Sequence, residues 1–139
     1  MEKDWIIHAV CLEEGFYFHT HGLNKKGHKE LEIDLDISPH SAAFVLHTIV
    51  DEIEKGNIYK DKDIFTSEKF MYDVVFVELE AKLPEGHEDT VLRIILVDET
   101  GKFPWDEGCS KFFENQCPEE LIPEIGKAMK ERKDQYQKP

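Results

Sequence analysis

The sequence predicts an α+β domain in which two main helices pack on a mostly antiparallel or mixed sheet of about five to six strands. Several segments of strand length alternate apolar and polar residues, and turn-forming residues separate them. One further segment carries both a helix start signal and a helix stop signal. The expected order is strand, strand, strand, helix, strand, strand, helix, which favours this class over a doubly wound sheet, with a split barrel as a fold-level analogy. The length of 139 residues fits a single domain over 1–139.

A β-hairpin is expected at the N-terminus, with strands over 5–12 and 16–23. The two glutamates and Gly15 between these strands suit a tight connection. Gly15 can adopt the positive φ that a three-residue loop needs, and such a loop would pair Leu12 with Phe16. A two-residue loop is the alternative, and it would shift the register of every following pair.

A strand and then a helix are expected next. Residues 31–37 alternate strictly, with aliphatic side chains on one face and three carboxylates on the other, which predicts a half-buried strand with an acidic outer face. Ser38 is placed to cap a helix and Pro39 to occupy its first position. An apolar stripe then runs over 42–53, and Gly56 supplies the left-handed stop.

The second half of the chain predicts two more strands and a closing helix. Residues 72–83 alternate again, and Pro84 opens a stretch with turn chemistry. Residues 90–98 are apolar on both faces, as expected of a central strand. The closing helix can begin at either of two prolines, Pro118 or Pro123.

The charge balance narrows the classes of partner. The chain has 30 acidic residues against 17 basic ones, a formal net charge of −13. Such a surface repels phosphate backbones and anionic lipid headgroups, so we expect neither nucleic acid nor membrane as a partner and consider a basic protein instead. No apolar run approaches the roughly 20 residues that cross a bilayer. No secretory signal is visible and the three cysteines lack paired spacing, which predicts a cytoplasmic protein.

Histidine is the enriched reactive residue. His19 and His21 stand two apart on an expected strand, so they share one face and could bind zinc if a third ligand arrives. In the three-residue hairpin register Cys11 shares that face, whereas the two-residue register brings His8 across from His21. Neighbouring strand histidines are more often ordinary hydrogen-bonded side chains, so we predict no cofactor and keep zinc and flavin as the alternatives.

The segment 101–109 is the most distinctive string in the chain. Phe103 and Trp105 flank a proline that stiffens the backbone, and such a loop can form a wall of a ligand pocket or a contact for a partner. It can equally be a lid packed into the core. Asp106 can cap a following turn, and Cys109 would be a nucleophile only if its pKa were lowered, so packing is the first expectation for that thiol.

Two strings carry a family resemblance. They are Gly22-Leu23 followed by Gly27-His28-Lys29-Glu30-Leu31, and Gly101-Lys102-Phe103-Pro104-Trp105-Asp106 with Gly108 and a trailing Gln116. In this order they resemble the motifs of the bacterial domain of unknown function 4262 family, over roughly residues 16–118. Lys29 departs from that family's proline, and the two strand histidines stand where it has aromatic or aliphatic residues. The resemblance implies no mechanism, but it makes His28, Glu30, Trp105 and Asp106 candidate binding residues.

The sequence therefore favours a non-catalytic binding or interaction module over an enzyme. Small size, acidic charge and the lack of a catalytic motif support this interpretation. A small-ligand or flavin-binding domain is the alternative, and a metal site on the histidines is the third hypothesis. Either a monomer or a homodimer is compatible with the sequence.

Overall fold

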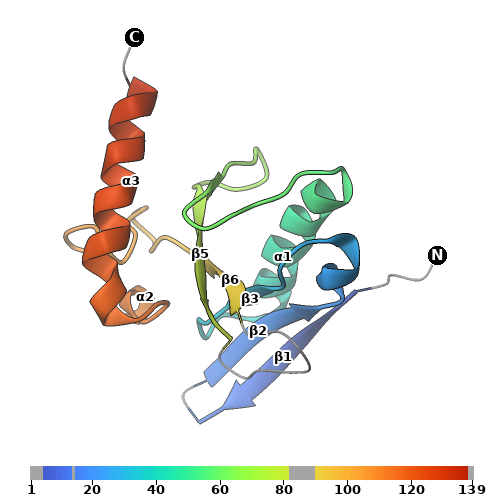
Figure 1. The fold of residues 1–139 in the computed structure, drawn as a ribbon. Coiled ribbons are helices and arrows are strands. Elements are labelled where there is room, and N and C mark those ends of the chain that lie inside the picture. Colours follow the sequence, from blue (N-terminus) through green and yellow to red (C-terminus); the bar gives the residue numbers. More distant parts are fainter. Residues whose placement is uncertain (1–4, 14, 82–89, 138–139) are drawn as a thin grey trace.

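The computed structural model describes residues 5–13, 15–81 and 90–137, and its centre is a mixed sheet of six strands (Figure 1). Their order across the sheet is β1-β2-β3-β6-β5-β4. The strands are β1 (Ile6–Leu12), β2 (Gly15–His21), β3 (Leu31–Ile33), β4 (Ile64–Phe65), β5 (Val74–Glu80) and β6 (Thr90–Ile95). The α+β class with a mixed sheet and two main helices is confirmed, whereas the short edge strand β4 was not predicted. The turn expected after Pro84 lies outside the described residues.

The N-terminal hairpin adopts the two-residue register. Leu12 pairs with Gly15 instead of Phe16, so the three-residue loop is wrong. Gly15 does have a positive φ of 119°, but it does so as the first residue of β2. The expected partner of His8 is also corrected, since His8 lies opposite His19 rather than His21. A shift of one residue in the register changes every cross-strand pair, so the loop length decides which residue lies opposite each histidine.

The expected strand over 31–37 is shorter than its alternation suggested. Only β3 pairs, antiparallel with β2 and parallel with β6. The acidic face of this strand was expected to point outward. Instead, β3 lies inside the sheet and Glu32 on this face is only 2% exposed. Asp34 is half-buried and Asp36 is exposed, where its Oδ1 accepts the Phe16 amide.

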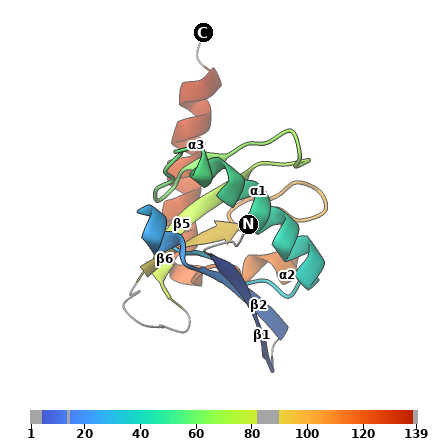
Figure 2. The same ribbon diagram turned by 90° about the vertical axis from the view of Figure 1, so that its right-hand side faces the viewer.

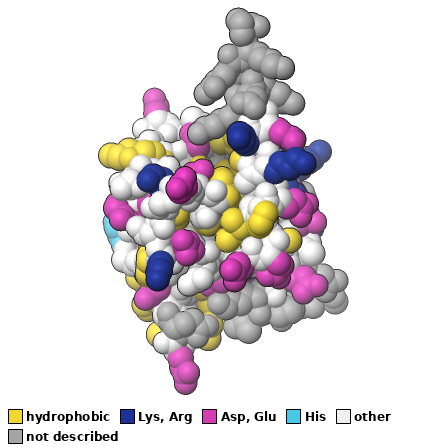
Figure 3. Space-filling model, turned by 90° about the vertical axis from the view of Figure 1, so that its left-hand side faces the viewer, with side chains coloured by type: hydrophobic (Ala, Val, Ile, Leu, Met, Phe, Trp, Pro, Cys, Tyr) yellow, Lys and Arg dark blue, Asp and Glu magenta, His cyan; other side chains and the backbone are white. Residues whose placement is uncertain are grey.

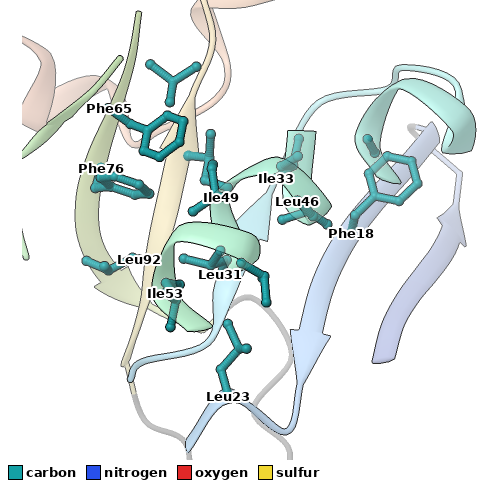
Figure 4. Close-up of a cluster of buried hydrophobic side chains, with 14 of the residues drawn as sticks. Phe18, Leu23, Leu31, Ile33, Leu46, Ile49, Ile53, Phe65, Phe76 and Leu92 are labelled. Atoms are coloured by element: carbon teal, nitrogen blue, oxygen red, sulfur yellow. The ribbon is translucent and has the colours of Figure 1, made fainter. Parts of the chain in front are cut away.

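Helix α1 (Pro39–Glu54) begins and ends at the predicted start and stop signals. The Ser38 hydroxyl accepts the Ser41 amide at 3.1 Å, and Gly56 ends the helix at φ 106°. Its apolar stripe covers one face of the sheet, where the main core packs (Figure 4). That core joins residues of α1, β2, β3, β5 and β6, among them Phe18, Leu31, Leu46, Ile49, Phe76 and Leu92.

The opposite face of the sheet carries helix α3 (Ile122–Gln137), so the two main helices lie on different sides (Figures 1 and 2). A second apolar cluster joins β5 and β6 to α3 through Val75, Val77, Ile95, Ile125 and Met129. Short turns connect the elements: the 3-10 helix η1 (Leu23–Lys26), α2 (Lys111–Glu114) and the 3-10 helix η2 (Glu119–Leu121). Of the two prolines at which the closing helix could begin, Pro123 is the second residue of α3, whereas Pro118 precedes the separate 3-10 helix η2.

None of the helices in the described part of the chain has the length and apolar character needed to cross a membrane.

Candidate functional site

A groove lies between the loop that follows β6 and helix α3, beside the strands β4 and β5. Its volume is about 970 Å³. The apolar lining comes from Ile64, Val75, Phe103, Trp105, Ile122, Pro123 and Met129, with Thr66, Asp73, Asp106, Lys127 and Lys130 among the polar residues. Figure 3 shows this side of the molecule, with apolar side chains gathered near its middle and charged side chains around them. We call this feature the 103/α3 groove.

Phe103 and Trp105 form one wall of the 103/α3 groove. Their rings stack in parallel, with centroids 4.8 Å apart and an interplanar angle of 11°. Both side chains are half-buried, while Pro104 between them is buried. Asp106 shapes this turn, since its Oδ2 accepts the Phe103 amide at 2.9 Å. The loop therefore packs against the body of the protein and lines the groove at the same time, so the two alternatives raised by the sequence coexist.

Asp98, just after β6, organises the whole loop. Its Oδ1 accepts the hydroxyl and amide of Thr100 at 2.7 and 2.9 Å and the Lys102 amide at 3.0 Å, and its Oδ2 accepts the Ser110 amide at 2.9 Å. The Lys102 amide, followed by the Thr100 hydroxyl, holds the pKa of this carboxyl far below its usual range. Asp98 was not among the predicted site residues, although an aspartate that follows an apolar strand and precedes a loop with glycine and proline was the available signal.

Helix α3 forms the opposite wall. Gly126 lets the helix approach Trp105 closely, because an added Cβ at this position would stand 2.8 Å from the Trp105 Cβ. Ile125 and Met129, both buried, fix the helix on the sheet. The groove thus depends on a glycine inside a helix, a position where glycine is otherwise unfavourable.

Cys109 closes the same loop as a packed thiol. It is 9% exposed, and its Sγ lies 3.6 Å from the carbonyl oxygens of Lys102 and Ser110. Burial, with the nearby carboxylates of Asp98 and Glu114, raises the pKa of the Cys109 thiol to about 11. A thiol held in its protonated form is a poor nucleophile at neutral pH.

His28 and Glu30 lie on the other side of the sheet and tie loops together. Glu30 accepts the Thr20 hydroxyl and the backbone amides of Gly22, Leu23 and Asn24 at 2.8–3.2 Å. His28 accepts the Tyr59 amide at Nε2, 3.0 Å away, so Nδ1 carries the proton and donates to the Lys29 carbonyl at 2.7 Å. The structure does not bring either residue to the 103/α3 groove, and these contacts support a structural role for both.

A row of polar residues crosses the sheet on the face that α3 partly covers. His8, His19, Glu32 and Arg93 are successive cross-strand partners on β1, β2, β3 and β6. Arg93 donates to Glu32 and, through Nη1, to the Gln116 carbonyl at 2.7 Å. Arg93 was not among the predicted site residues, and its signal was a single arginine within a mostly apolar strand.

His19 and His21 share one face of β2, as expected from their spacing. Cys11 lies on the opposite face of β1 from His8, so it is not a third ligand in the observed register. Within residues 5–13, 15–81 and 90–137, no three His, Cys, Asp or Glu side chains are already grouped to hold a metal ion.

Comparison with known proteins gives one match. The family described as Domain of unknown function (DUF4262) matches residues 1–110. No curated protein and no solved structure matches the chain. The family match includes the Phe103–Trp105 wall of the groove and ends before α3, so the second wall is built from residues outside the matched range.

Proposed function

This chain belongs to the family described as Domain of unknown function (DUF4262), and from that premise we propose that it is a non-catalytic binding module for a basic protein partner. The 103/α3 groove takes an apolar segment of that partner. The stacked pair of Phe103 and Trp105 is the observation that carries the proposal. Rigid aromatic side chains in a partly desolvated groove are the residues that contribute most to binding energy at protein interfaces.

The charge of the chain supports a basic partner. Acidic residues exceed basic ones by 30 − 17 = 13 over the full sequence. Asp73 and Asp106 are exposed at the groove itself, opposite Lys127 and Lys130 on α3. A segment with aliphatic or aromatic anchors and flanking lysines or arginines would fill the groove and gain long-range attraction from the rest of the surface. That attraction speeds association and weakens at high salt.

The chemistry of the groove favours binding over catalysis. Cys109 belongs to the same loop as the aromatic wall, and the raised pKa of its thiol keeps it protonated at neutral pH. Asp106 uses its Oδ2 to hold the Phe103 amide. These groups position the wall of the groove and do not form an acid–base pair.

The test is selection of peptides from a random 12-residue display library on the immobilised protein, followed by measurement of each peptide's affinity. We expect selected peptides to combine apolar anchors with lysine or arginine. Binding should weaken about tenfold or more in Trp105→Ala, in line with loss of an interface anchor, and should weaken as salt rises. Circular dichroism and urea denaturation establish that this variant is folded.

Met71→Ala is the matched control, because Met71 is a large apolar side chain that is 88% exposed and does not line the groove. Its affinity should equal that of the unmodified chain. Peptides that bind Trp105→Ala as well as the unmodified chain, that lack basic residues, or that fail to appear at all would overturn the proposal.

A flat aromatic ligand such as a flavin is the competing occupant of the same groove. Native mass spectrometry of gently purified protein distinguishes the two, since a bound flavin adds its own mass and a visible absorbance band. A stoichiometric flavin mass would replace the peptide proposal.

A further inference from the structure

Three histidines gather on one face of the β1–β2 hairpin, away from the 103/α3 groove. His8 lies directly opposite His19, with ring centroids 4.7 Å apart in an edge-to-face arrangement. His21 lies on the same face, two residues after His19, and its ring centroid is 5.8 Å from that of His8. The two-residue hairpin register produces this cluster, which we call the imidazole cluster.

The central histidine of the cluster has an unsatisfied buried nitrogen. His19 is 8% exposed, and its Nε2 has no hydrogen-bond partner among residues 5–13, 15–81 and 90–137. The other ring nitrogen, Nδ1, lies 3.4 Å from the Thr20 carbonyl oxygen. An unpartnered buried polar atom is costly, so a bound water or ion is the expected partner of this nitrogen.

The tautomer suits metal binding. With its proton on Nδ1, facing the Thr20 carbonyl, His19 keeps a lone pair on Nε2. Metal-bound histidines commonly donate their second ring nitrogen to a backbone carbonyl in this way, which fixes the orientation of the ring. The contact with the Thr20 carbonyl would thus orient the His19 ring for a metal ion at Nε2.

We propose that His8 and His19 bind one divalent transition-metal ion, with His21 as the third imidazole and solvent at the remaining position. Two imidazoles bound to one tetrahedral ion at about 2.0–2.1 Å place their ring centres roughly 5 Å apart. The His8–His19 distance of 4.7 Å is close to that spacing. The His8 and His21 rings are 5.8 Å apart but stacked at 13°, so the His21 ring must turn before it can share an ion with His8. His21 is exposed, and its ring must rotate inward to complete the set, because no three His, Cys, Asp or Glu side chains of the described residues are grouped to hold a metal ion.

The ligand type selects the class of ion. Imidazole nitrogen suits Zn²⁺, Cu²⁺, Ni²⁺ and Co²⁺, whereas Ca²⁺ and Mg²⁺ require oxygen ligands. The net charge of −13 raises the local concentration of cations near the surface.

The test uses the untagged full chain, freed of metal by a chelator and titrated with Zn²⁺ in a calorimeter. We expect one ion per chain and no binding of Ca²⁺ or Mg²⁺. His8→Ala and His19→Ala should each weaken Zn²⁺ binding tenfold or more, and His21→Ala should weaken it less. His40→Ala is the matched control, because His40 is exposed at the start of α1 and lies outside the cluster.

A second readout does not depend on a variant that folds. Long-range ¹H–¹⁵N spectra of the unmodified chain should show the Nε2 resonance of His19 shifting on addition of Zn²⁺, while the Nδ1 resonance stays that of a protonated nitrogen. Absence of stoichiometric Zn²⁺ binding, an unmoved Nε2 resonance, or equal binding by the His8→Ala/His19→Ala double variant would overturn the proposal. Trp105→Ala should bind Zn²⁺ normally, so failure of the groove proposal and failure of the metal proposal are separable.

Discussion

Arg93 on β6 and Glu32 on β3 face each other across the parallel strands in the middle of the sheet, and Arg93 donates from both Nε and Nη2 to one oxygen of Glu32. Their side chains are 6% and 2% exposed. Asp34 adds a second carboxylate 3.6 Å from Nη1. A buried charge is tolerated when it is paired and hydrogen-bonded in this way. Arg93 and Glu32 therefore each offset the cost of burying the other's charge.

Removal of one partner of this pair should be more costly than removal of both. We expect Arg93→Met to lower the free energy of unfolding by about 3–5 kcal/mol, because Glu32 is left as an uncompensated buried charge. The double variant Arg93→Met/Glu32→Leu should recover part of that loss. Urea denaturation measures both, with Lys111→Met as the exposed control. A double variant that is less stable than Arg93→Met would contradict this account of the pair.

Gly126→Ala should destabilise the protein, although alanine normally favours a helix by about 1 kcal/mol over glycine. The new Cβ would stand 2.8 Å from the Trp105 Cβ, so helix and loop must separate. We expect a loss of about 1–3 kcal/mol, typical of overpacking, and a red shift of tryptophan emission as Trp105 becomes more exposed. Glu131→Ala, exposed on the same helix, provides the comparison. Stabilisation by Gly126→Ala would show that α3 does not pack as described.

Asp98→Asn should lower the melting temperature at neutral pH but have little effect in strong acid. The pKa of Asp98 is depressed in the folded state, chiefly by the amide of Lys102 and the hydroxyl of Thr100. Its stabilising contribution is therefore complete above the ordinary aspartate pKa of about 4. That contribution falls as the pH drops through the lower folded value. The gap between the melting temperatures of the two proteins should stay constant from pH 7 to about pH 4 and should narrow from there to pH 2. A pH-independent gap would count against the hydrogen-bond network.

The three cysteines should differ in reactivity. Cys11 is exposed, whereas Cys109 and Cys117 are buried. Burial raises the pKa of both buried thiols, that of Cys109 to about 11, so at pH 8 only about one Cys109 thiol in a thousand is ionised. Ellman's reagent should modify one cysteine rapidly, and that fast phase should vanish in Cys11→Ser. Unfolding in guanidinium should expose the other two. Rapid reaction of Cys109 in the folded chain would point to an activated thiol and reopen a catalytic hypothesis.

Short-range signals in the sequence were enough to predict most of the helices and strands. The helix from Pro39 was predictable because its cap, first proline, apolar stripe and terminal glycine all agree at short range. The central strand β6 was predictable because apolar residues occupy both of its faces. The family was recognisable from two short strings, and the same strings contain Phe103 and Trp105, which line the groove.

Only the tertiary structure decided which side chains of those helices and strands contact one another. Whether Glu32 faces water or Arg93 depends on a pairing between strands 61 residues apart, and no alternation pattern contains that information. Whether His8 lies opposite His19 depends on one residue of loop length, because a slip of one position exchanges the two faces of a strand. The second wall of the groove depends on Gly126 meeting Trp105. The sequence thus determined the elements through short-range rules, while the candidate sites arise from long-range contacts that only the packed chain defines.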